Sequence, residues 1–226
     1  MKVLAIKAES SALIFDLDNT LYTNAAYASF QEKVLLERLG CELGVGLDAA
    51  AAKVEALRTE RAAAGLGKTS LGKLFAALGV GIATSVRWRE ECIEPGEWLI
   101  RDPRLDRALG SLAKEYTLAV MTNNPRLIGE KSLDALGIRP RFSVLIGLDN
   151  TLTGKPAPEP FIETARMLGL EPRFCVSIGD RLDVDLVPAL ELGMGAILVD
   201  GVEDVYRLPE LLAEGGPLQH GWRSRD

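Results

Sequence analysis

The chain contains five short runs of residues that are almost continuously apolar. They cover residues 11–16, 116–122, 142–147, 174–179 and 195–200. Runs rich in Val, Ile, Leu and Phe, without alternating polar positions, are typical of strands that are covered on both faces. Helical patterns separate the last four runs, at residues 126–136, 159–168 and 184–192. This alternation of strand and helix predicts an α/β fold with a doubly wound parallel sheet.

The segment between the first two runs has a different pattern. Residues 24–100 contain no convincing strand and are rich in Ala, Leu, Glu, Lys and Arg, which favour helices. We expect helices near residues 25–39, 48–64, 70–78 and 83–93. The sequence therefore predicts an all-helical domain at 24–100, inserted into an α/β core domain formed by residues 1–23 and 101–226.

Composition and charge exclude several classes of protein. With 226 residues, of which 47% are hydrophobic, the chain can bury a substantial core. Its net charge of −6 argues against nucleic acid or an anionic membrane as the main partner. We find no stretch that is long and apolar enough to span a bilayer and no secretory leader, and the three cysteines form no CxxC pair, so we expect a cytoplasmic protein. The chain has one histidine, His220, which lies in a polar tail, so the sequence argues against histidine-based catalysis.

Polar residues gather directly after the predicted strands. In an open parallel sheet, ligands bind beyond the carboxyl ends of the strands. The first run is followed by Asp16 and Asp18, and the second by Thr122 with Asn123. Further along the chain come Lys155, in the loop before the fourth run, and the acidic residues Asp180, Asp183 and Asp185 after it. We expect these side chains to share one crevice.

Several carboxylates in one crevice require a compensating cation. Two like charges about 4 Å apart repel by about 4 kcal/mol at an effective dielectric constant near 20. An all-oxygen set of ligands selects a hard ion, and Mg²⁺ is the favoured one. A bound Mg²⁺ also attracts phosphate, to which Thr122 and Asn123 can donate hydrogen bonds. The pattern therefore predicts a metal–phosphate site.

Four segments also carry a resemblance to a known family. In order, "DLDNT", "MTNN", "GKPAPEPF" and "GDRLDVD" resemble the four motifs of the haloacid dehalogenase-like hydrolase superfamily. The inserted helical segment resembles the type-one cap of that superfamily, and "GDRLDVDLVPALELGM" resembles its phosphatase branches. The resemblance implies a Rossmann-like core and a Mg²⁺-dependent phosphatase that works through an aspartyl-phosphate intermediate.

The resemblance implies catalytic roles for three residues. Asp16 resembles the nucleophile, which also binds the metal, and Asp18 the general acid and base, whose backbone carbonyl binds the metal. Lys155 resembles the residue that holds the nucleophile and the phosphate together. An ordinary Asp has a pKa near 4, so Asp16 needs no base to become an anionic nucleophile. Asp18 lies two residues further on and shares a face with Asp16 in extended geometry.

Four further residues take binding roles from the same resemblance. Thr122 and Asn123 resemble the phosphate-binding residues, Asp180 a direct metal ligand, and Asp185 a metal ligand or a residue behind one. Arg181 departs from the serine or asparagine that is often found after the Gly-Asp pair in this superfamily.

Other functions remain open at this point. A carbon–halogen hydrolase of the same superfamily needs no metal and lacks the second aspartate, so Asp18 counts against it. A catalytically silent binding protein and a phosphomutase are further alternatives. Sugar phosphates, phosphoglycolate-like acids and nucleotides all remain candidate substrates, and we expect Trp88 and Trp98 to be packing residues. We also expect the basic residues of the helical segment to be mostly surface charges: Arg58, Arg61, Lys68, Lys73, Arg87 and Arg89.

Overall fold

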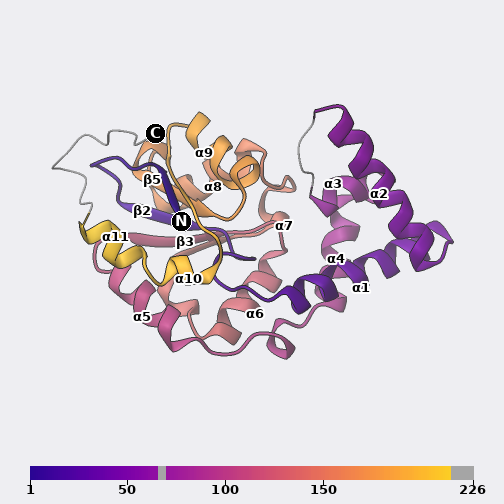
Figure 1. The fold of residues 1–226 in the computed structure, drawn as a ribbon, viewed down its shortest axis with the longest axis horizontal. Helices are drawn as coiled ribbons and strands as arrows, with labels where there is room; N and C mark the ends of the chain where they lie inside the picture. Colours follow the sequence, from indigo (N-terminus) through magenta and orange to yellow (C-terminus); the bar gives the residue numbers. More distant parts are fainter. Residues whose placement is uncertain (66–69, 215–226) are drawn as a thin grey trace.

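A six-stranded sheet forms the centre of the protein in the computed structural model, which describes residues 1–65 and 70–214 (Figure 1). His220 and Lys68 lie outside the described residues. In sheet order the strands are β1 (Lys2–Ala5), β6 (Gly195–Leu198), β5 (Cys175–Gly179), β2 (Ala12–Phe15), β3 (Thr117–Met121) and β4 (Val144–Ile146). All neighbours pair in parallel except β1, which runs antiparallel to β6. The predicted α/β class is thus confirmed, but the sheet is not wholly parallel, and β1 was not predicted.

Helices cover both faces of the sheet. On one face lie α5 (Pro103–Leu112), α6 (Arg126–Leu136), α10 (Val202–Val205) and α11 (Leu208–Glu214). On the other face lie α8 (Pro158–Leu168) and α9 (Val187–Glu191). Alternate residues of β2 serve the two sides, because Leu13 and Phe15 face the first layer whereas Ala12 and Ile14 face the second. This double coverage explains why the strands are almost continuously apolar.

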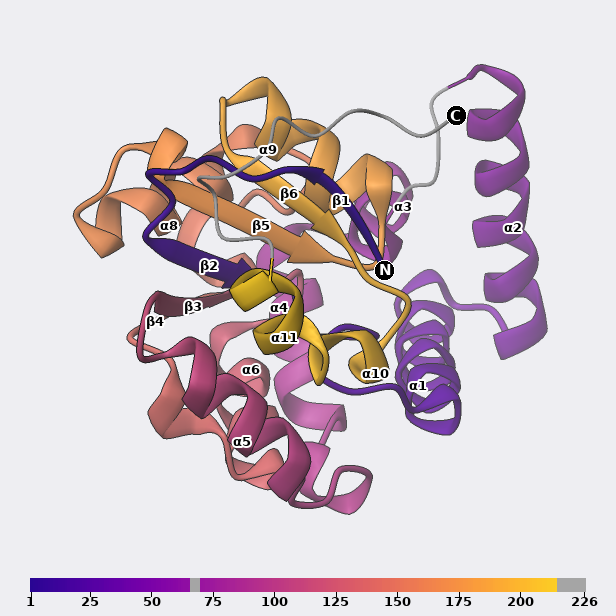
Figure 2. The ribbon, with the colours of Figure 1, turned by 60° about the vertical axis from the view of Figure 1, so that its left-hand side comes forward.

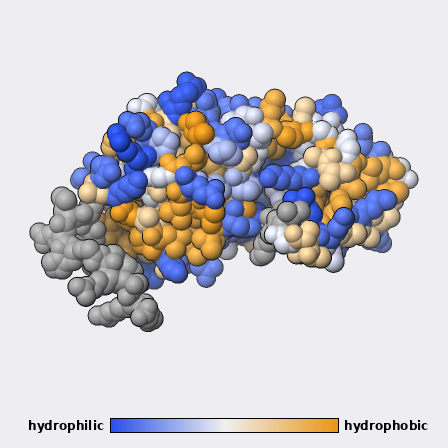
Figure 3. Space-filling model, turned by 90° about the horizontal axis from the view of Figure 1, so that it is seen from above, coloured by the Kyte–Doolittle hydropathy of each residue, from blue (hydrophilic) through white to orange (hydrophobic). Residues whose placement is uncertain are grey.

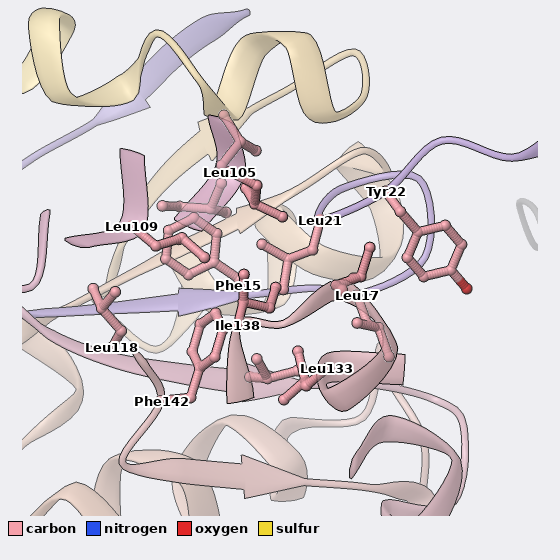
Figure 4. Packing of buried hydrophobic residues seen from close by; sticks show 14 of the residues in the cluster. Phe15, Leu17, Leu21, Tyr22, Leu105, Leu109, Leu118, Leu133, Ile138 and Phe142 are labelled. Carbon is pink, nitrogen blue, oxygen red and sulfur yellow. The ribbon is translucent and has the colours of Figure 1, made fainter. Parts of the chain in front are cut away.

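The larger of the two cores lies beneath β2 and extends to the loop after it (Figure 4). Phe15 and Phe142 pack edge to face, with ring centroids 6.1 Å apart. Leu17 and Leu21 are fully buried in the same cluster and anchor the loop that carries the polar residues. Tyr22 lies at the margin of the cluster, with its hydroxyl pointing away from the leucines.

Four helices fill the segment between β2 and α5: α1 (Ala25–Leu43), α2 (Leu47–Ala63), α3 (Leu71–Ala77) and α4 (Ile82–Cys92). They pack around their own apolar cluster, in which Leu39, Leu74 and Phe75 are fully buried. We call residues 24–100 the helical insert; it lies beside the sheet, to the right in Figure 1. Trp88 packs edge-on against Phe75 within it, as expected for a packing residue.

The connection from the insert back to the sheet is also held by packing. The Trp98 ring stacks on Tyr27 and Phe30 of α1, with centroids 5.8 and 4.7 Å away. Asn24 begins α1 by accepting a hydrogen bond from the backbone N–H of Tyr27, and its side-chain amide donates to the Trp98 carbonyl. Figure 2 shows α1 and α2 beside the sheet from a second direction.

The remaining short elements are connections. They are α7 (Leu148–Thr151), a wide π-type turn at Leu182–Leu186, and the 3₁₀ turns Pro95–Glu97, Arg139–Arg141 and Pro172–Phe174. The helix predicted at 184–192 is thus divided into the π-type turn and the short α9. Such wide turns often occur at functional sites.

Candidate active site

The sheet topology brings the predicted site residues together. Strand β2 lies between β3 and β5, and Phe15 is opposite Val120 of one and Ile178 of the other. Asp16 follows β2 and extends the ladder, because its backbone N–H donates to the Ile178 carbonyl at 2.8 Å. Thr122 and Asp180 follow the two neighbouring strands at the same edge. The polar residues therefore lie at the carboxyl ends of three adjacent strands.

Lys155 is the central cation of this edge. Its side chain is only 2% exposed, and its Nζ lies 2.6 Å from Oδ1 of Asp16 and 2.6 Å from Oδ1 of Asp185. Burial alone would lower the pKa of Lys155, but the two carboxylates raise it above its ordinary value. The ammonium is therefore charged at neutral pH.

Asn123 positions the backbone of Lys155. The backbone N–H of Lys155 donates to Oδ1 of Asn123 at 2.7 Å, and Nδ2 of Asn123 donates to the Lys155 carbonyl at 3.1 Å. The side chain of Asn123 is therefore already engaged, although its expected role was to bind phosphate. The hydroxyl of Thr122, which is buried, accepts a hydrogen bond from the backbone N–H of Asn124 at 3.1 Å.

Three carboxylates form a cluster that fits a hard metal ion. Asp16, Asp180 and Asp185 each offer an oxygen atom, and these atoms lie within 4.8 Å of one another. Burial is the main cause that raises the pKa of Asp16 to about 8, and it likewise raises the pKa of Asp180 to about 6. The charge of Asp185 adds to both shifts. The expectation that Asp16 is anionic at neutral pH without help is therefore wrong for the cluster without a further cation. Lys155 alone does not balance the cluster, and the all-oxygen donor set suits Mg²⁺.

The position of Asp185 depends on close backbone contacts. Its backbone N–H donates to the Arg181 carbonyl at 2.8 Å, and its carbonyl accepts from the Ser177 hydroxyl at 2.8 Å. The Arg181 N–H donates to Oδ2 of Asp185 at 3.1 Å. A Cβ atom on Gly179 would lie 2.6 Å from Cβ of Asp185, so only glycine leaves room for this carboxylate. The residue that departs from the family pattern, Arg181, thus contributes a backbone contact.

Asp18 has different neighbours and lies outside the carboxylate cluster. Its Oδ1 accepts hydrogen bonds from the Tyr22 hydroxyl and, at 3.4 Å, from Nε2 of Gln31. Its Oδ2 accepts from Nδ2 of Asn124 at 2.9 Å. Asn19 adopts a left-handed conformation, with φ of 55°, which turns the chain after Asp18 and is tolerated by asparagine. A metal contact of Asp18 would have to come from its backbone carbonyl, as the resemblance implies.

Sequence reasoning assigned no role to the three residues that surround Asp18. Asn124 comes directly after Asn123 in the "MTNN" segment, so the sequence already indicated that it lies near the other polar residues. Tyr22 lies four residues after Asp18 and its pKa is raised well above the ordinary value, by burial first and by Asp18 second, so it remains a donor. Gln31 belongs to α1 of the helical insert, and no local signal connects it with the sheet.

A cavity of about 450 Å³ opens between this edge of the sheet and the helical insert. Asp18, Asn123 and Arg181 line it from the core, and α1, α2, α3 and α4 line it from the insert. Figure 3 shows hydrophilic residues on the exposed surface between the two parts. Arg89 also lines the cavity and is buried, so it is an exception to the expectation that most basic residues of this segment are surface charges.

The comparisons with known proteins agree with this geometry. A family model described as haloacid dehalogenase-like hydrolase matches residues 11–193, so the chain belongs to this family of hydrolases. This confirms the membership and the enzyme class predicted from the four motifs. No helix in the described ranges is long and apolar enough to cross a membrane.

Individual relatives extend the comparison. Phosphoglycolate phosphatases of Escherichia coli (strain K12) and Shigella boydii serotype 4 (strain Sb227) are each 35% identical to this chain over 105 residues. The match covers 46% of this chain and 41% of each relative, so the chain spans about two fifths of their length.

Two solved structures share the fold over most of the chain. A HAD phosphatase from Thermococcus onnurineus has a TM-score of 0.64 at 23% identity, covering 91% of this chain and 98% of its own. A 2-haloacid dehalogenase from Pseudomonas syringae pv. Tomato DC3000 has a TM-score of 0.57 at 23% identity, covering 91% of this chain and 99% of its own. At this identity the likeness establishes the fold alone.

Proposed function

We propose that this protein is a Mg²⁺-dependent phosphatase that hydrolyses a small phosphomonoester through an aspartyl-phosphate on Asp16. The observation that carries the proposal is the position of Lys155, buried between Asp16 and Asp185 beside a third carboxylate, Asp180. The cluster lies at the sheet edge where α/β proteins bind ligands, beside the cavity. Similarity of part of the chain to phosphoglycolate phosphatases supports the same class of reaction.

In the first step, Asp16 attacks the phosphorus atom and the bond to the leaving alcohol oxygen breaks. Lys155 holds Oδ1 of Asp16, whereas Oδ2 accepts no hydrogen bond from the described residues and is the freer oxygen for attack. Asp18 gives its proton to the leaving oxygen. In the second step Asp18 takes a proton from water, which attacks the phosphorus atom of the aspartyl-phosphate. The bond between phosphorus and the Asp16 oxygen breaks, so inorganic phosphate is released and the Asp16 carboxylate is restored.

The surrounding residues position Asp18 and Lys155. Tyr22, Asn124 and Gln31 hold Asp18 through hydrogen bonds, and Asn123 holds the backbone of Lys155. Thr122 and Asn123 are proposed to contact the phosphate, Thr122 through its hydroxyl and Asn123 through groups other than its engaged amide.

Mg²⁺ would be held by Asp16, Asp180 and Asp185, with the backbone carbonyl of Asp18 as a further oxygen. When bound, the ion neutralises negative charge on the phosphoryl group and on the clustered carboxylates. We further propose that residues 24–100 form a cap domain over the α/β core and that the enzyme works in the cytoplasm on a small phosphorylated metabolite.

A screen of small phosphomonoesters tests the proposal. We expect the wild-type protein with Mg²⁺ to release inorganic phosphate from at least one sugar phosphate, phosphorylated acid or nucleotide. Asp16→Asn, purified in parallel, is the blank for contaminating phosphatases. Chloride release from a 2-chloro acid, with no phosphate release from the whole panel, would favour the dehalogenase alternative and overturn the proposal.

A further inference from the structure

Arg89 is a buried arginine inside the helical insert. It lies on α4, is only 6% exposed, and lines the cavity that also contains Asp18. The α4 helix packs against α6 and α7 of the core. The charge of Asp18, which lines the same cavity, opposes the effect of burial on the pKa of Arg89.

The guanidinium of Arg89 is only partly satisfied by protein groups. Its Nη1 donates to the Ser85 carbonyl at 3.0 Å and to the Ser85 hydroxyl. Among the described residues no carboxylate lies within 4.0 Å of it, and neither Nε nor Nη2 has a protein acceptor. These two atoms are not among the fully enclosed polar atoms without partners, so part of their surface is accessible, and Arg89 lines the cavity.

A buried guanidinium without an anionic partner among the described residues, such as that of Arg89, destabilises the fold unless a ligand supplies the anion. Burial lowers the pKa of Arg89 to about 10, against the opposing charge of Asp18, so the side chain is still a cation at neutral pH. A buried charge is normally paired with an opposite charge. The Nε and Nη2 edge of a guanidinium presents two parallel N–H groups, the geometry that binds a carboxylate in a bidentate manner.

The other cations at the cavity differ from Arg89. Arg58 forms ion pairs with Glu32 at 2.5 Å and with Glu55 at 3.4 Å. Lys73 is exposed to solvent, and Arg181 lies on the core side, where its backbone binds Asp185. Among the described cations that line the cavity, Arg89 is therefore the one with the strongest demand for an anion.

We infer that Arg89 is a specificity residue that binds a carboxylate of the substrate, at the end remote from the phosphoryl group. This inference rests on the proposed phosphatase function and narrows its substrates to phosphorylated carboxylic acids. One molecule would place its phosphoryl group at Asp16 and its carboxylate on the Nε and Nη2 edge of Arg89. A neutral ester of the same size would leave that edge unpaired.

Matched pairs of esters test the inference. The probes are 2-phosphoglycolate, 3-phosphooxypropanoate and 4-phosphooxybutanoate, each compared with its neutral carboxamide. We expect wild-type kcat/KM to favour the acid over the amide at least about tenfold for one chain length, because the amide loses a charge-assisted bidentate contact. Arg89→Met should reduce that ratio to near one, and Arg89→Lys, which keeps the charge but not the fork, should give an intermediate ratio.

The control variant is Arg87→Met on the same helix. Arg87 is exposed and lies near Glu91, at 3.8 Å, so its loss should leave the acid-to-amide ratio at the wild-type value. If the wild-type protein had the same kcat/KM for acid and amide at all three chain lengths, the inference would be overturned. This result does not depend on whether Arg89→Met folds. A folded Arg89→Met with the wild-type ratio would overturn the inference as well. Failure of the wild-type protein to hydrolyse any phosphomonoester would instead overturn the proposed function, and the inference with it.

Discussion

At the scale of single residues, the site is organised around one buried ammonium group. Lys155 compensates two carboxylates at once, through contacts of 2.6 Å to Asp16 and 2.6 Å to Asp185. A buried ion pair contributes little compared with an apolar replacement, but removal of one partner leaves the other charge uncompensated. Lys155 therefore stabilises the fold, in addition to the catalytic role that we propose for it.

Lys155→Met should lower the free energy of unfolding by about 3–5 kcal/mol, since Asp16 and Asp185 then lose their cation. Mg²⁺ should restore part of this loss, because it supplies charge to the same carboxylates. Denaturant unfolding with and without Mg²⁺ measures both effects. The matched control is Lys33→Met, whose side chain is 65% exposed and makes only an i,i+4 pair, and it should change stability little. If Lys155→Met and Lys33→Met had the same free energy of unfolding, this account would be contradicted.

Asp18→Asn should separate the two chemical steps. The leaving group p-nitrophenolate needs little protonation, so Asp16 should still be phosphorylated once by p-nitrophenyl phosphate. The second step lacks its base, so the aspartyl-phosphate should accumulate. The measurement is a burst of p-nitrophenol followed by near-zero turnover, with an increase of one phosphoryl group in intact mass. Asp16→Asn should show neither burst nor turnover, and wild-type turnover in either variant would refute the assigned roles.

The residues of this site were predictable to different degrees. Asp16, Asp180 and Asp185 could be predicted as one cluster because polar residues directly after parallel strands must meet at one edge. The side-chain contacts of Asp18 could not, because Gln31 approaches from a helix of the insert. Burial of Arg89 was also inaccessible, because the helical pattern of the segment does not tell which charged positions face the core.

At the scale of elements, the end of β5 and the turn after it determine where Asp185 lies. The π-type turn at Leu182–Leu186 directs Asp185 toward Lys155, and Gly179 leaves the space that its carboxylate occupies. A side chain at Gly179 would displace the carboxylate, because the backbone on both sides is held by hydrogen bonds.

Gly179→Ala should therefore reduce phosphatase turnover by at least about tenfold and lower stability by about 1–3 kcal/mol, as overpacking does. Steady-state kinetics and thermal unfolding provide the two measurements. Gly46→Ala is the matched control, since a Cβ atom at Gly46 meets nothing within 4 Å. Wild-type kinetics in Gly179→Ala would show that Asp185 is not held as described.

The strands followed from the sequence, with one exception, whereas the helices followed less completely: α5, α7, α10 and α11 were not predicted, and the helix predicted at 184–192 is divided. The five apolar runs correspond to β2 to β6, because strands that are buried on both faces leave an unbroken apolar signal. Strand β1 is short and partly exposed, and it joins the sheet edge through pairing with β6, which lies almost at the other end of the chain. Its apolar run is short and ends at Lys7, and nothing in the local sequence indicates such a distant partner.

In the whole molecule, the α/β part and the helical insert both contribute residues around the site. The α/β part supplies the carboxylates and Lys155, whereas the helical insert supplies Gln31 and the buried Arg89. The cavity between them is lined by Asp18, which supports the proposal that the insert selects substrates and excludes water.

Metal dependence of the wild-type protein tests the central claim most directly. The carboxylate cluster is incompletely compensated by Lys155, so we expect the proposed phosphatase to require Mg²⁺. Hydrolysis of p-nitrophenyl phosphate is followed after EDTA treatment and again during titration with Mg²⁺. We expect activity to vanish in EDTA and to return with Mg²⁺ in saturable fashion. Full phosphatase activity in EDTA would contradict the account. So would a protein that has no phosphatase activity and releases halide from a 2-halo acid at the same rate with and without EDTA.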